Sequence, residues 1–343
     1  MTLKRVVIVD DSPSMRSLIR QCLLRDGRFE IAGEASDPYD AREIIRLTSP
    51  DVLTLDVEMP RMDGLTFLER LMRLRPMPVV MLSTETHRGS SAAIDALELG
   101  AVDCIGKPRA DRPDTLADLA ERVFVASEAR LPGASRPELR PSGNFRWNGR
   151  IVLIGASTGG VDALERVLLS MPRNAPPILI AQHMPGPFLA SFAERLARRV
   201  APNVALARGG EQVLQGQVRI APGGEHHLGL RASGKDVWCD LVADGKVNGH
   251  RPSVDYLFNS ATSFAPLVVP VLLTGMGRDG AECMLKLSKA GASSIAQDRD
   301  SCVVYGMPRV AADLGAARRI LPLGRIAEAI LEETSAPEAG RTR

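Results

Sequence analysis

The sequence predicts two α/β domains, each built around a doubly wound parallel sheet, within 343 residues. In both halves, short apolar runs rich in β-branched residues alternate with stretches whose apolar residues recur at helical spacing, as in repeated βα units. A segment dense in Pro, Gly, Ser and Arg separates the two series. A chain of this length can bury two substantial cores.

These changes in composition give the expected domain boundaries. We expect a first domain over residues 1–123, a semi-flexible linker over 124–148, a second domain over 149–335 and a disordered tail over 336–343.

The composition is ordinary for a globular protein and excludes several function classes. Hydrophobic residues make up 45% and charged residues 24%, with a net charge of +2. This balance argues against a nucleic-acid binder and a membrane-surface protein. The start of the chain does not resemble a signal peptide, no apolar run approaches the length of a membrane span, and the five cysteines show no metal-ligand spacing. We therefore expect a cytoplasmic protein with buried free thiols, without nucleic-acid binding or membrane insertion.

The first half contains five predicted βα units. Strands are expected at 6–9, 29–33, 52–55, 79–82 and 102–105, and helices at 15–25, 39–47, 65–73, 90–99 and 116–125.

Polar side chains follow four of these strands and define the first candidate site. Asp10 and Asp11 follow the first strand, Asp56 the third, Ser83 the fourth and Lys107 the fifth. The carboxyl ends of parallel strands share one edge of a sheet, so these groups are expected to meet. Three carboxylates brought together repel one another unless a hard cation such as Mg²⁺ joins them. A carboxylate beside such an ion is suited to attack a phosphoryl group.

The first half resembles the receiver domain of two-component response regulators. The resemblance rests on Val-Asp10-Asp11-Ser, Leu-Asp56-Val-Glu-Met-Pro-Arg-Met-Asp-Gly64 and Lys107-Pro108. It implies a flavodoxin-like sheet, with Asp56 as phospho-acceptor and Asp10, Asp11 and Asp56 as Mg²⁺ ligands. It further implies that Ser83 is the switch hydroxyl and that Lys107 contacts the phosphoryl group. Cys104 departs from the pattern, because many receivers carry an aromatic switch residue there.

In the second half, the apolar run 151–154 leads into Gly155-Ala-Ser157-Thr-Gly159-Gly160 and then a helical stretch. The glycine spacing around Ser157 fits a nucleophile elbow, in which a tight strand-to-helix turn presents a serine hydroxyl. The N–H groups of the following helix would contribute to an oxyanion hole. A phosphate-binding turn and a plain βα loop are the alternatives that this motif leaves open.

A histidine and an aspartate follow two further predicted strands. His183 comes after the run 177–182, and Asp279 follows the run 267–274 with a short Gly-rich loop between. At one sheet edge, His183 would take the serine proton and Asp279 would fix the imidazole tautomer. The other histidines, His87, His226, His227 and His250, remain candidates for the base. The order Ser, His, Asp differs from the α/β-hydrolase order.

The second half resembles the catalytic domain of the chemotaxis protein-glutamate methylesterases, the CheB family. The shared motifs are Gly-Ala-Ser157-Thr-Gly-Gly, Gln-His183-Met-Pro, Ile-Ala-Pro-Gly-Gly224, Asn248-Gly-His-Arg-Pro-Ser-Val-Asp255, Leu-Leu-Thr-Gly-Met276-Gly-Arg-Asp279-Gly and Ile-Ala-Gln297-Asp298. The resemblance implies a Rossmann-like domain with the triad Ser157, His183 and Asp279, and with backbone near Thr158 and Met276 around the oxyanion. It implies no metal in the ester step. Cys283-Met284 departs from the Gly-Leu usual in relatives.

The resemblance implies a serine esterase that demethylates glutamyl γ-methyl esters on the cytoplasmic helices of methyl-accepting chemoreceptors, releasing methanol in chemotaxis adaptation. Deamidation of receptor glutamines at the same site is a second implied activity. A chemotaxis histidine kinase would be the phosphodonor. We further expect the resting receiver to cover the face that holds Ser157, and phosphorylation of Asp56 to uncover it.

Two alternatives belong to other classes of function. A DNA-binding effector is disfavoured, because residues 150–343 contain no short helix-turn-helix module and carry 22 Lys and Arg against 18 Asp and Glu, a net charge of +4. A non-catalytic adaptor remains open, although the complete set of Ser157, His183 and Asp279 argues against it.

Overall fold

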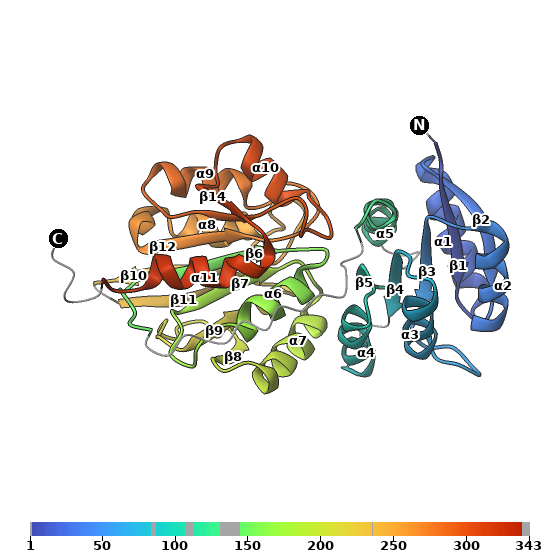
Figure 1. The fold of residues 1–343 in the computed structure, drawn as a ribbon, viewed down its shortest axis with the longest axis horizontal. Coiled ribbons are helices and arrows are strands. Elements are labelled where there is room, and N and C mark those ends of the chain that lie inside the picture. Colours follow the sequence, from blue (N-terminus) through green and yellow to red (C-terminus); the bar gives the residue numbers. More distant parts are fainter. Residues whose placement is uncertain (1, 84–86, 108–112, 131–144, 235, 338–343) are drawn as a thin grey trace. The chain divides into compact units, whose positions relative to one another are not determined.

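The computed structural model of the chain describes residues 2–83, 87–107, 113–130, 145–234 and 236–337. The chain divides into two compact units, Met1–Gly133 and Ala134–Arg343 (Figure 1). Most of the expected linker, and residues 338–343 of the expected tail, lie outside the described residues. The last helix of the first unit continues to Ser127, so the first residues of the expected linker are helical.

The first unit is a parallel sheet of five strands in the order β2-β1-β3-β4-β5, which confirms the predicted doubly wound architecture. Its strands are β1 (Lys4–Val9), β2 (Phe29–Ala35), β3 (Val52–Asp56), β4 (Val79–Ser83) and β5 (Asp103–Gly106). Its helices are α1 (Pro13–Asp26), α2 (Pro38–Thr48), α3 (Gly64–Leu74), α4 (His87–Glu98) and α5 (Pro113–Ser127).

Helices α1 and α5 contact each other, as do α3 and α4.

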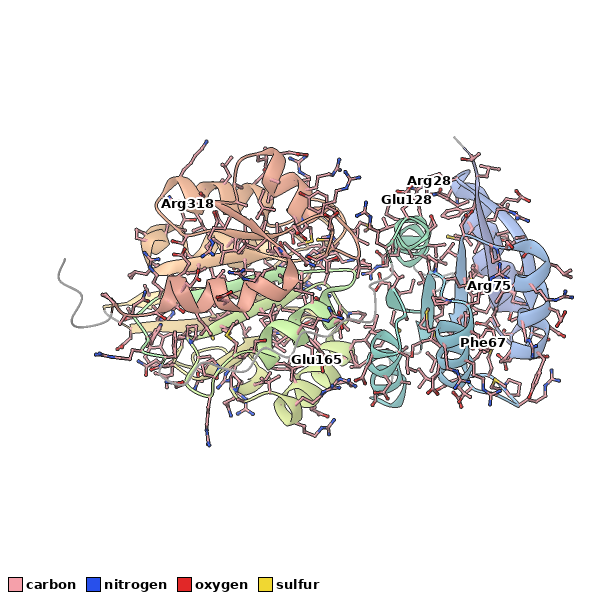
Figure 2. The ribbon with its side chains drawn as sticks, viewed as in Figure 1. Arg28, Phe67, Arg75, Glu128, Glu165 and Arg318 are labelled. Carbon is pink, nitrogen blue, oxygen red and sulfur yellow. The ribbon has the colours of Figure 1, made fainter. Side chains whose placement is uncertain are left out.

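Burial and local capping explain why these helices and strands form where they do. Every residue of β3 and β4 is buried, as strands covered on both faces require. Ser12 begins α1 by accepting a hydrogen bond from Met15 N, and Gly27 ends it at a φ of 82°. Arg28, labelled in Figure 2, directly precedes β2. Its guanidinium lies 4.2 Å from the ring centroid of Phe124 in α5.

The second unit is built on a parallel sheet of seven strands in the order β14-β13-β12-β6-β7-β9-β8. These strands are β6 (Ile151–Ala156), β7 (Ile178–Gln182), β8 (Asn203–Leu206), β9 (Gln217–Ile220), β12 (Val268–Leu272), β13 (Ile295–Gln297) and β14 (Arg319–Leu321). An antiparallel pair that the sequence analysis did not predict, β10 (His227–Ser233) with β11 (Asp236–Val242), adds a separate two-stranded sheet.

Two groups of helices accompany the seven-stranded sheet. The helices of this unit are α6 (Gly160–Leu169), α7 (Gly186–Arg199), α8 (Val254–Ser260), α9 (Ala281–Lys289), α10 (Met307–Asp313) and α11 (Leu323–Thr334), with a 3₁₀ turn at Thr262–Leu267. Helix α6 contacts α7 and α11, whereas α9 contacts α8 and α10.

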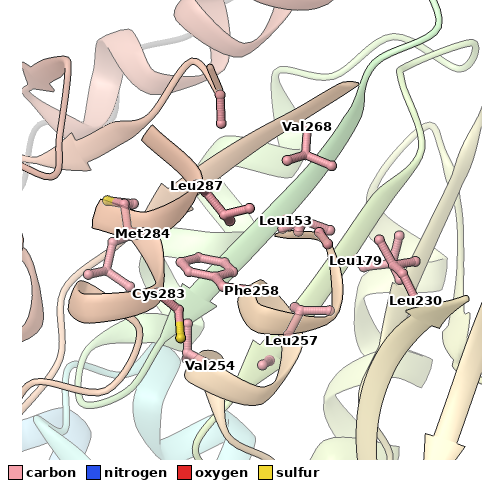
Figure 3. Close-up of a cluster of buried hydrophobic side chains, with 14 of the residues drawn as sticks. Leu153, Leu179, Leu230, Val254, Leu257, Phe258, Val268, Cys283, Met284 and Leu287 are labelled. Carbon is pink, nitrogen blue, oxygen red and sulfur yellow. The ribbon is translucent and has the colours of Figure 1, made fainter. Parts of the chain in front are cut away.

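A buried apolar cluster joins α8 and α9 to the central strands (Figure 3). Leu153 of β6 and Leu179 of β7 belong to it, together with Leu257 and Phe258 of α8 and Met284 of α9. All five side chains are fully buried. This packing fixes the starts of both helices beside the ends of the central strands.

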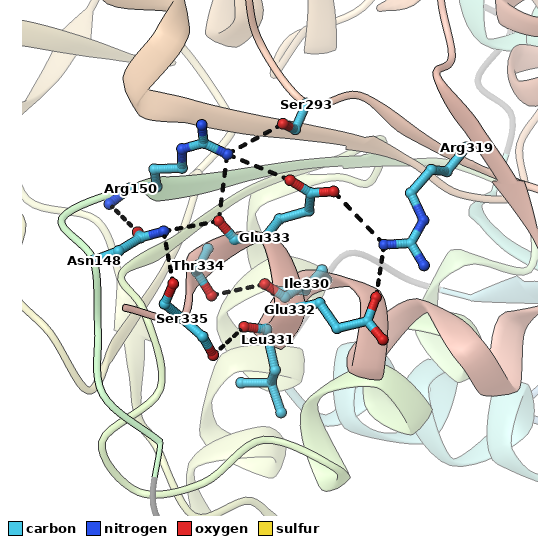
Figure 4. Close-up of polar contacts among 10 residues, drawn as sticks. All are labelled: Asn148, Arg150, Ser293, Arg319, Ile330, Leu331, Glu332, Glu333, Thr334 and Ser335. Carbon is cyan, nitrogen blue, oxygen red and sulfur yellow. Dashed lines mark hydrogen bonds and ion pairs between the residues drawn. The ribbon is translucent and has the colours of Figure 1, made fainter. Parts of the chain in front are cut away.

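The two ends of the second unit are tied together (Figure 4). Trp147 forms an antiparallel bridge with Ser335, and Asn148 N donates to Thr334 O at 2.9 Å. Arg150, just before β6, donates through Nη1 to Ser293 Oγ and to both the carbonyl and the carboxylate of Glu333.

Within the part of the chain that the structure describes, no helix combines the length and the apolar character needed to cross a membrane. The cysteines are free thiols; four are buried, as predicted, and Cys22 is half-buried instead.

Candidate active site and phosphorylation site

Ser157 occupies the turn between β6 and α6. It directly follows β6, and Gly159, at a φ of 76°, precedes the first residue of α6. Ser157 N donates to Thr274 O at 3.1 Å, and Ser157 O accepts from Gly160 N at 2.8 Å and from Gln182 Nε2 at 2.9 Å. The backbone on both sides of the hydroxyl is therefore held by neighbouring strands and by the helix start.

Glycine at position 275 allows the segment after β12 to approach Ser157. A Cβ on Gly275 would lie 2.7 Å from Ser157 Cβ and 2.6 Å from Met307 Sδ. Both distances are shorter than side chains tolerate. A residue other than glycine here would displace the serine.

His183 lies beside Ser157 at the carboxyl edge of the sheet. Ala156, the last residue of β6, pairs with Gln182, the last residue of β7. Ser157 follows the first strand and His183 follows the second, so the two residues leave the sheet side by side. His183 Nε2 is 2.8 Å from Asp279 Oδ2, with the two side chains only 1% and 2% exposed. The structure thus brings the three predicted side chains to one sheet edge.

Asp279 is held by five hydrogen bonds. Besides His183, its donors are Asn248 Nδ2 (2.9 Å), Ser253 Oγ (2.9 Å), Val254 N (2.7 Å) and Asp255 N (3.1 Å). Burial alone would raise the pKa of Asp279, but the bonds from His183, Asn248 and Val254 outweigh burial and hold that pKa well below its usual range.

The ionised Asp279 fixes the tautomer of His183. A carboxylate only accepts, so His183 Nε2 carries the proton and Nδ1 is left with a lone pair. Nδ1 is buried and accepts no hydrogen bond from the described residues, Ser157 Oγ included. Such contacts are often long in the absence of substrate and shorten when it binds. Nδ1 is therefore available to take a proton.

The other histidines occupy different surroundings. His250 stacks on the His183 ring, with centroids 3.8 Å apart and planes 10° apart. His227 is buried, bonds Gly245 O through Nε2, and accepts from Ser253 N at Nδ1. His226 is half-buried. The side chain of His87 lies outside the described residues.

Thr158 directly follows the serine, and Met276 directly follows Gly275, which packs against the serine. Thr158 is 3% exposed, and its carbonyl accepts from Thr274 Oγ1 at 3.0 Å. Met276 is half-buried and follows Gly275, whose N–H donates to Val304 O at 3.1 Å. Gln297 supports the same segment by accepting from Thr274 N at 2.8 Å.

The first unit gathers its own cluster at the carboxyl ends of its strands. Ligand oxygens of Asp10, Asp11 and Asp56 lie within 4.8 Å of one another. Lys107 Nζ is 2.7 Å from Asp56 Oδ2 and 3.4 Å from Asp10 Oδ2. Ser83 is the buried last residue of β4, and its carbonyl accepts from Lys107 N at 2.9 Å.

Burial and mutual repulsion shift the pKa values of this cluster. Burial raises the pKa of Asp56 to about 6, with a further contribution from the charge of Asp10 that Lys107 opposes. Burial also raises the pKa of Asp10, whose Oδ2 is buried and accepts no hydrogen bond among the described residues. Cys104 is buried in β5, and burial raises the pKa of its thiol.

Two family models match the chain. Residues 152–330, more than half of the chain, match the family model described as CheB methylesterase. The chain belongs to the CheB methylesterase family. Residues 6–119 match the response regulator receiver domain, so both resemblances that the sequence indicated are confirmed.

Relatives in the CheB family are similar to this chain over nearly its whole length. A protein of Agrobacterium fabrum is 49% identical over 98% of this chain and 99% of its own length. A protein of Rhizobium etli is 50% identical over 98% of each chain. Both are named protein-glutamate methylesterase/protein-glutamine glutaminase. The solved Thermotoga maritima CheB methylesterase catalytic domain is 40% identical and covers 54% of this chain and 98% of its own, with a TM-score of 0.52.

Four residues of this CheB-type site belong to the sequence motifs, but the motifs alone do not indicate their roles. Asn248 and Ser253 hold Asp279, Gln182 holds the Ser157 carbonyl, and Gln297 holds Thr274. The sequence signals that could have indicated these residues were a Gln at the end of an apolar strand and a Ser just before a helix. Neither signal identifies the group that the side chain contacts.

Proposed function

We propose that this CheB-family chain is a serine esterase that hydrolyses glutamyl γ-methyl esters on methyl-accepting chemoreceptors, under control of its receiver domain. The observation that carries the proposal is the 2.8 Å contact between His183 and Asp279 next to Ser157. The names of the relatives at 49% and 50% identity support the substrate class.

The chemistry follows from the three side chains. Ser157 Oγ attacks the ester carbonyl and gives its proton to His183 Nδ1, while Asp279 stabilises the imidazolium that forms. His183 then protonates the departing oxygen, so the C–O bond breaks, methanol leaves and an acyl-enzyme remains. Water, deprotonated by His183, hydrolyses the acyl-enzyme and restores a glutamate carboxylate and the free serine.

Backbone N–H groups near Thr158 and Met276 are the proposed donors to the oxyanion. The carbonyl of Thr158 and both polar groups of Gly275 are already bonded within the protein, which holds these peptides rigid. The same site would deamidate a glutamine by releasing ammonia instead of methanol, in line with the second half of the relatives' names. Amide hydrolysis is the harder reaction, because an amine leaves less readily than an alcohol.

In the receiver domain we assign Asp56 as phospho-acceptor, and Asp10, Asp11 and Asp56 as residues that hold Mg²⁺. The three close carboxylates, and the buried Asp10 Oδ2 that accepts no hydrogen bond from the described residues, fit a hard divalent cation. When bound, Mg²⁺ would offset the charge of the incoming phosphoryl oxygens. Lys107 would contact the phosphoryl group and Ser83 would supply the switch hydroxyl.

A chemotaxis histidine kinase is the proposed phosphodonor, and the receptors' cytoplasmic helices are the proposed substrate, so we place the protein in the cytoplasm. Phosphorylation of Asp56 is proposed to raise esterase activity. Support comes from the receiver domain at residues 6–119 preceding the esterase domain in one chain.

Methanol release from methylated receptor fragments tests both halves of the proposal. The wild type is compared with Ser157→Ala and Asp56→Asn, with and without a small-molecule phosphodonor and Mg²⁺. Release should vanish in Ser157→Ala and should rise with phosphodonor only when Asp56 is present. If the wild type releases no methanol while Asp56 still accepts phosphate, the non-catalytic adaptor is the better description.

A further inference from the structure

Two acidic side chains lie across from each other at the starts of α8 and α9. Asp279 immediately precedes Gly280, the N-cap of α9, and accepts from Val254 N and Asp255 N at the start of α8. Asp255, in the first turn of α8, accepts from Cys283 N of α9 at 3.1 Å. Each carboxylate therefore satisfies backbone donors of the other helix.

The side-chain amide of Asn248 lies between these two carboxylates. Its Nδ2 is 2.9 Å from Asp279 Oδ1 and 2.6 Å from Asp255 Oδ2. A primary amide has two N–H bonds, so one is directed to each carboxylate. Asn248 has a φ of 52°, a left-handed conformation that asparagine adopts more readily than most residues.

This bridge acts on the oxygen of Asp279 that does not face the catalytic histidine. Oδ1 accepts from Asn248, Ser253 Oγ and Asp255 N, whereas Oδ2 accepts from Val254 N and faces His183. The two carboxylates would repel each other without a donor between them. Burial, followed by the charge of Asp279, raises the pKa of Asp255.

We propose that Asn248 is a positioning residue of the esterase site. It fixes the rotation of the Asp279 carboxylate and separates it from the charge of Asp255, so that His183 is held in the orientation for proton transfer. The proposal rests on the proposed esterase function for its kinetic test.

Four variants separate contact with Asp279 from contact with Asp255. Asn248→Asp replaces the amide by an acceptor of the same shape and φ preference. Asp255→Asn leaves the Asn248 bond to Asp279 in place. The double exchange Asn248→Asp with Asp255→Asn restores a donor–acceptor pair between positions 248 and 255, but it still directs a carboxylate at Asp279. Asn259→Asp, on the exposed part of α8, is the matched control for the change in charge.

The expected signature is a loss of kcat with little change in KM. Asn248→Asp and the double exchange should each lower kcat for methanol release by roughly ten- to a hundredfold, by analogy with the removal of hydrogen-bond partners that orient metal-binding side chains. Asp255→Asn and Asn259→Asp should stay within about threefold of wild type. Recovery in the double exchange, or an unchanged kcat in Asn248→Asp, would overturn the proposal.

A second measurement keeps this proposal separable from the esterase proposal. The proton on His183 Nε2, held by Asp279, is expected to give a resolved downfield ¹H NMR resonance in the wild type, Asp255→Asn and Asn259→Asp. It should shift or broaden in Asn248→Asp and in the double exchange. A wild type that releases no methanol would refute the esterase, whereas an unchanged resonance in Asn248→Asp would refute the role of Asn248.

Discussion

Gly275 packs against Ser157 so tightly that a methyl group at position 275 has no room. In Gly275→Ala the new Cβ would lie 2.7 Å from Ser157 Cβ, so the serine must move. We expect kcat to fall about a hundredfold, since displacements of about 1 Å have that effect on positioned nucleophiles. Methanol release measures it. Gly245→Ala, whose Cβ would meet nothing within 4 Å, is the control and should keep full activity.

Asp279 makes the stability of the second unit depend on pH. Its pKa is lower in the folded protein than in the unfolded chain, because its hydrogen bonds outweigh burial. The stabilisation is therefore present above about pH 4, the ordinary carboxyl pKa, and is lost progressively as the pH falls below it. The two tryptophans, Trp147 and Trp238, lie in this unit and report its unfolding.

The prediction concerns the difference in urea midpoint between the wild type and Asp279→Asn, which should become smaller as the pH falls. The wild type should exceed Asp279→Asn in urea midpoint, followed by tryptophan fluorescence, at neutral pH. That difference should shrink between about pH 5 and about pH 3. A difference that stayed constant over this range would contradict the assigned shift.

Single residues show how far sequence reasoning reaches. Ser157, His183 and Asp279 were predicted to meet because each follows a strand, and parallel strand ends share an edge. Asn248 follows no strand. Its contact with Asp279 depends on how the loop before α8 folds back, which has no signal along the sequence.

At the scale of elements, the ends of the second unit are joined by a polar network around Arg150 (Figure 4). Its side chain, 30% exposed, bonds Glu333 and Ser293. We expect Arg150→Ala to lower the free energy of unfolding by about 1 kcal/mol, a value reduced for partial exposure. The control Arg325→Ala removes an ion pair with Glu328, in which the two side chains are 61% and 50% exposed. Its loss should lower the free energy of unfolding by less than about 0.5 kcal/mol. If urea titrations showed the same loss of unfolding free energy in Arg150→Ala and Arg325→Ala, this ranking would be contradicted.

The elements of the first unit were predicted, whereas several elements of the second unit, the helix α11 and the short strands among them, were not. The apolar runs 6–9 and 79–82 make up most of β1 and β4, so the existence of these strands was clear. In β10 four buried residues are followed by three exposed ones, a pattern without the alternation that marks a strand. The strands β13 and β14 have three residues each, too few to show any period.

At the scale of the whole molecule, the proposed control by phosphorylation predicts how the second unit behaves alone. Residues 145–343 contain a complete core and both tied ends. We expect this fragment to release methanol roughly tenfold faster than the unphosphorylated full chain, within the usual range of coupling between sites. It should not respond to a phosphodonor. Activity equal to or below that of the resting full chain would contradict restraint by the receiver.

The tied ends of the second unit also decide how the protein should be attached to a solid support. The bridge between Trp147 and Ser335 places the end of α11 next to the residues that lead into β6, whereas Ser157 follows the other end of β6. Six residues of strand separate the two edges by about 20 Å. An enzyme bound to a resin through a C-terminal tag would thus be held by the sheet edge opposite its nucleophile.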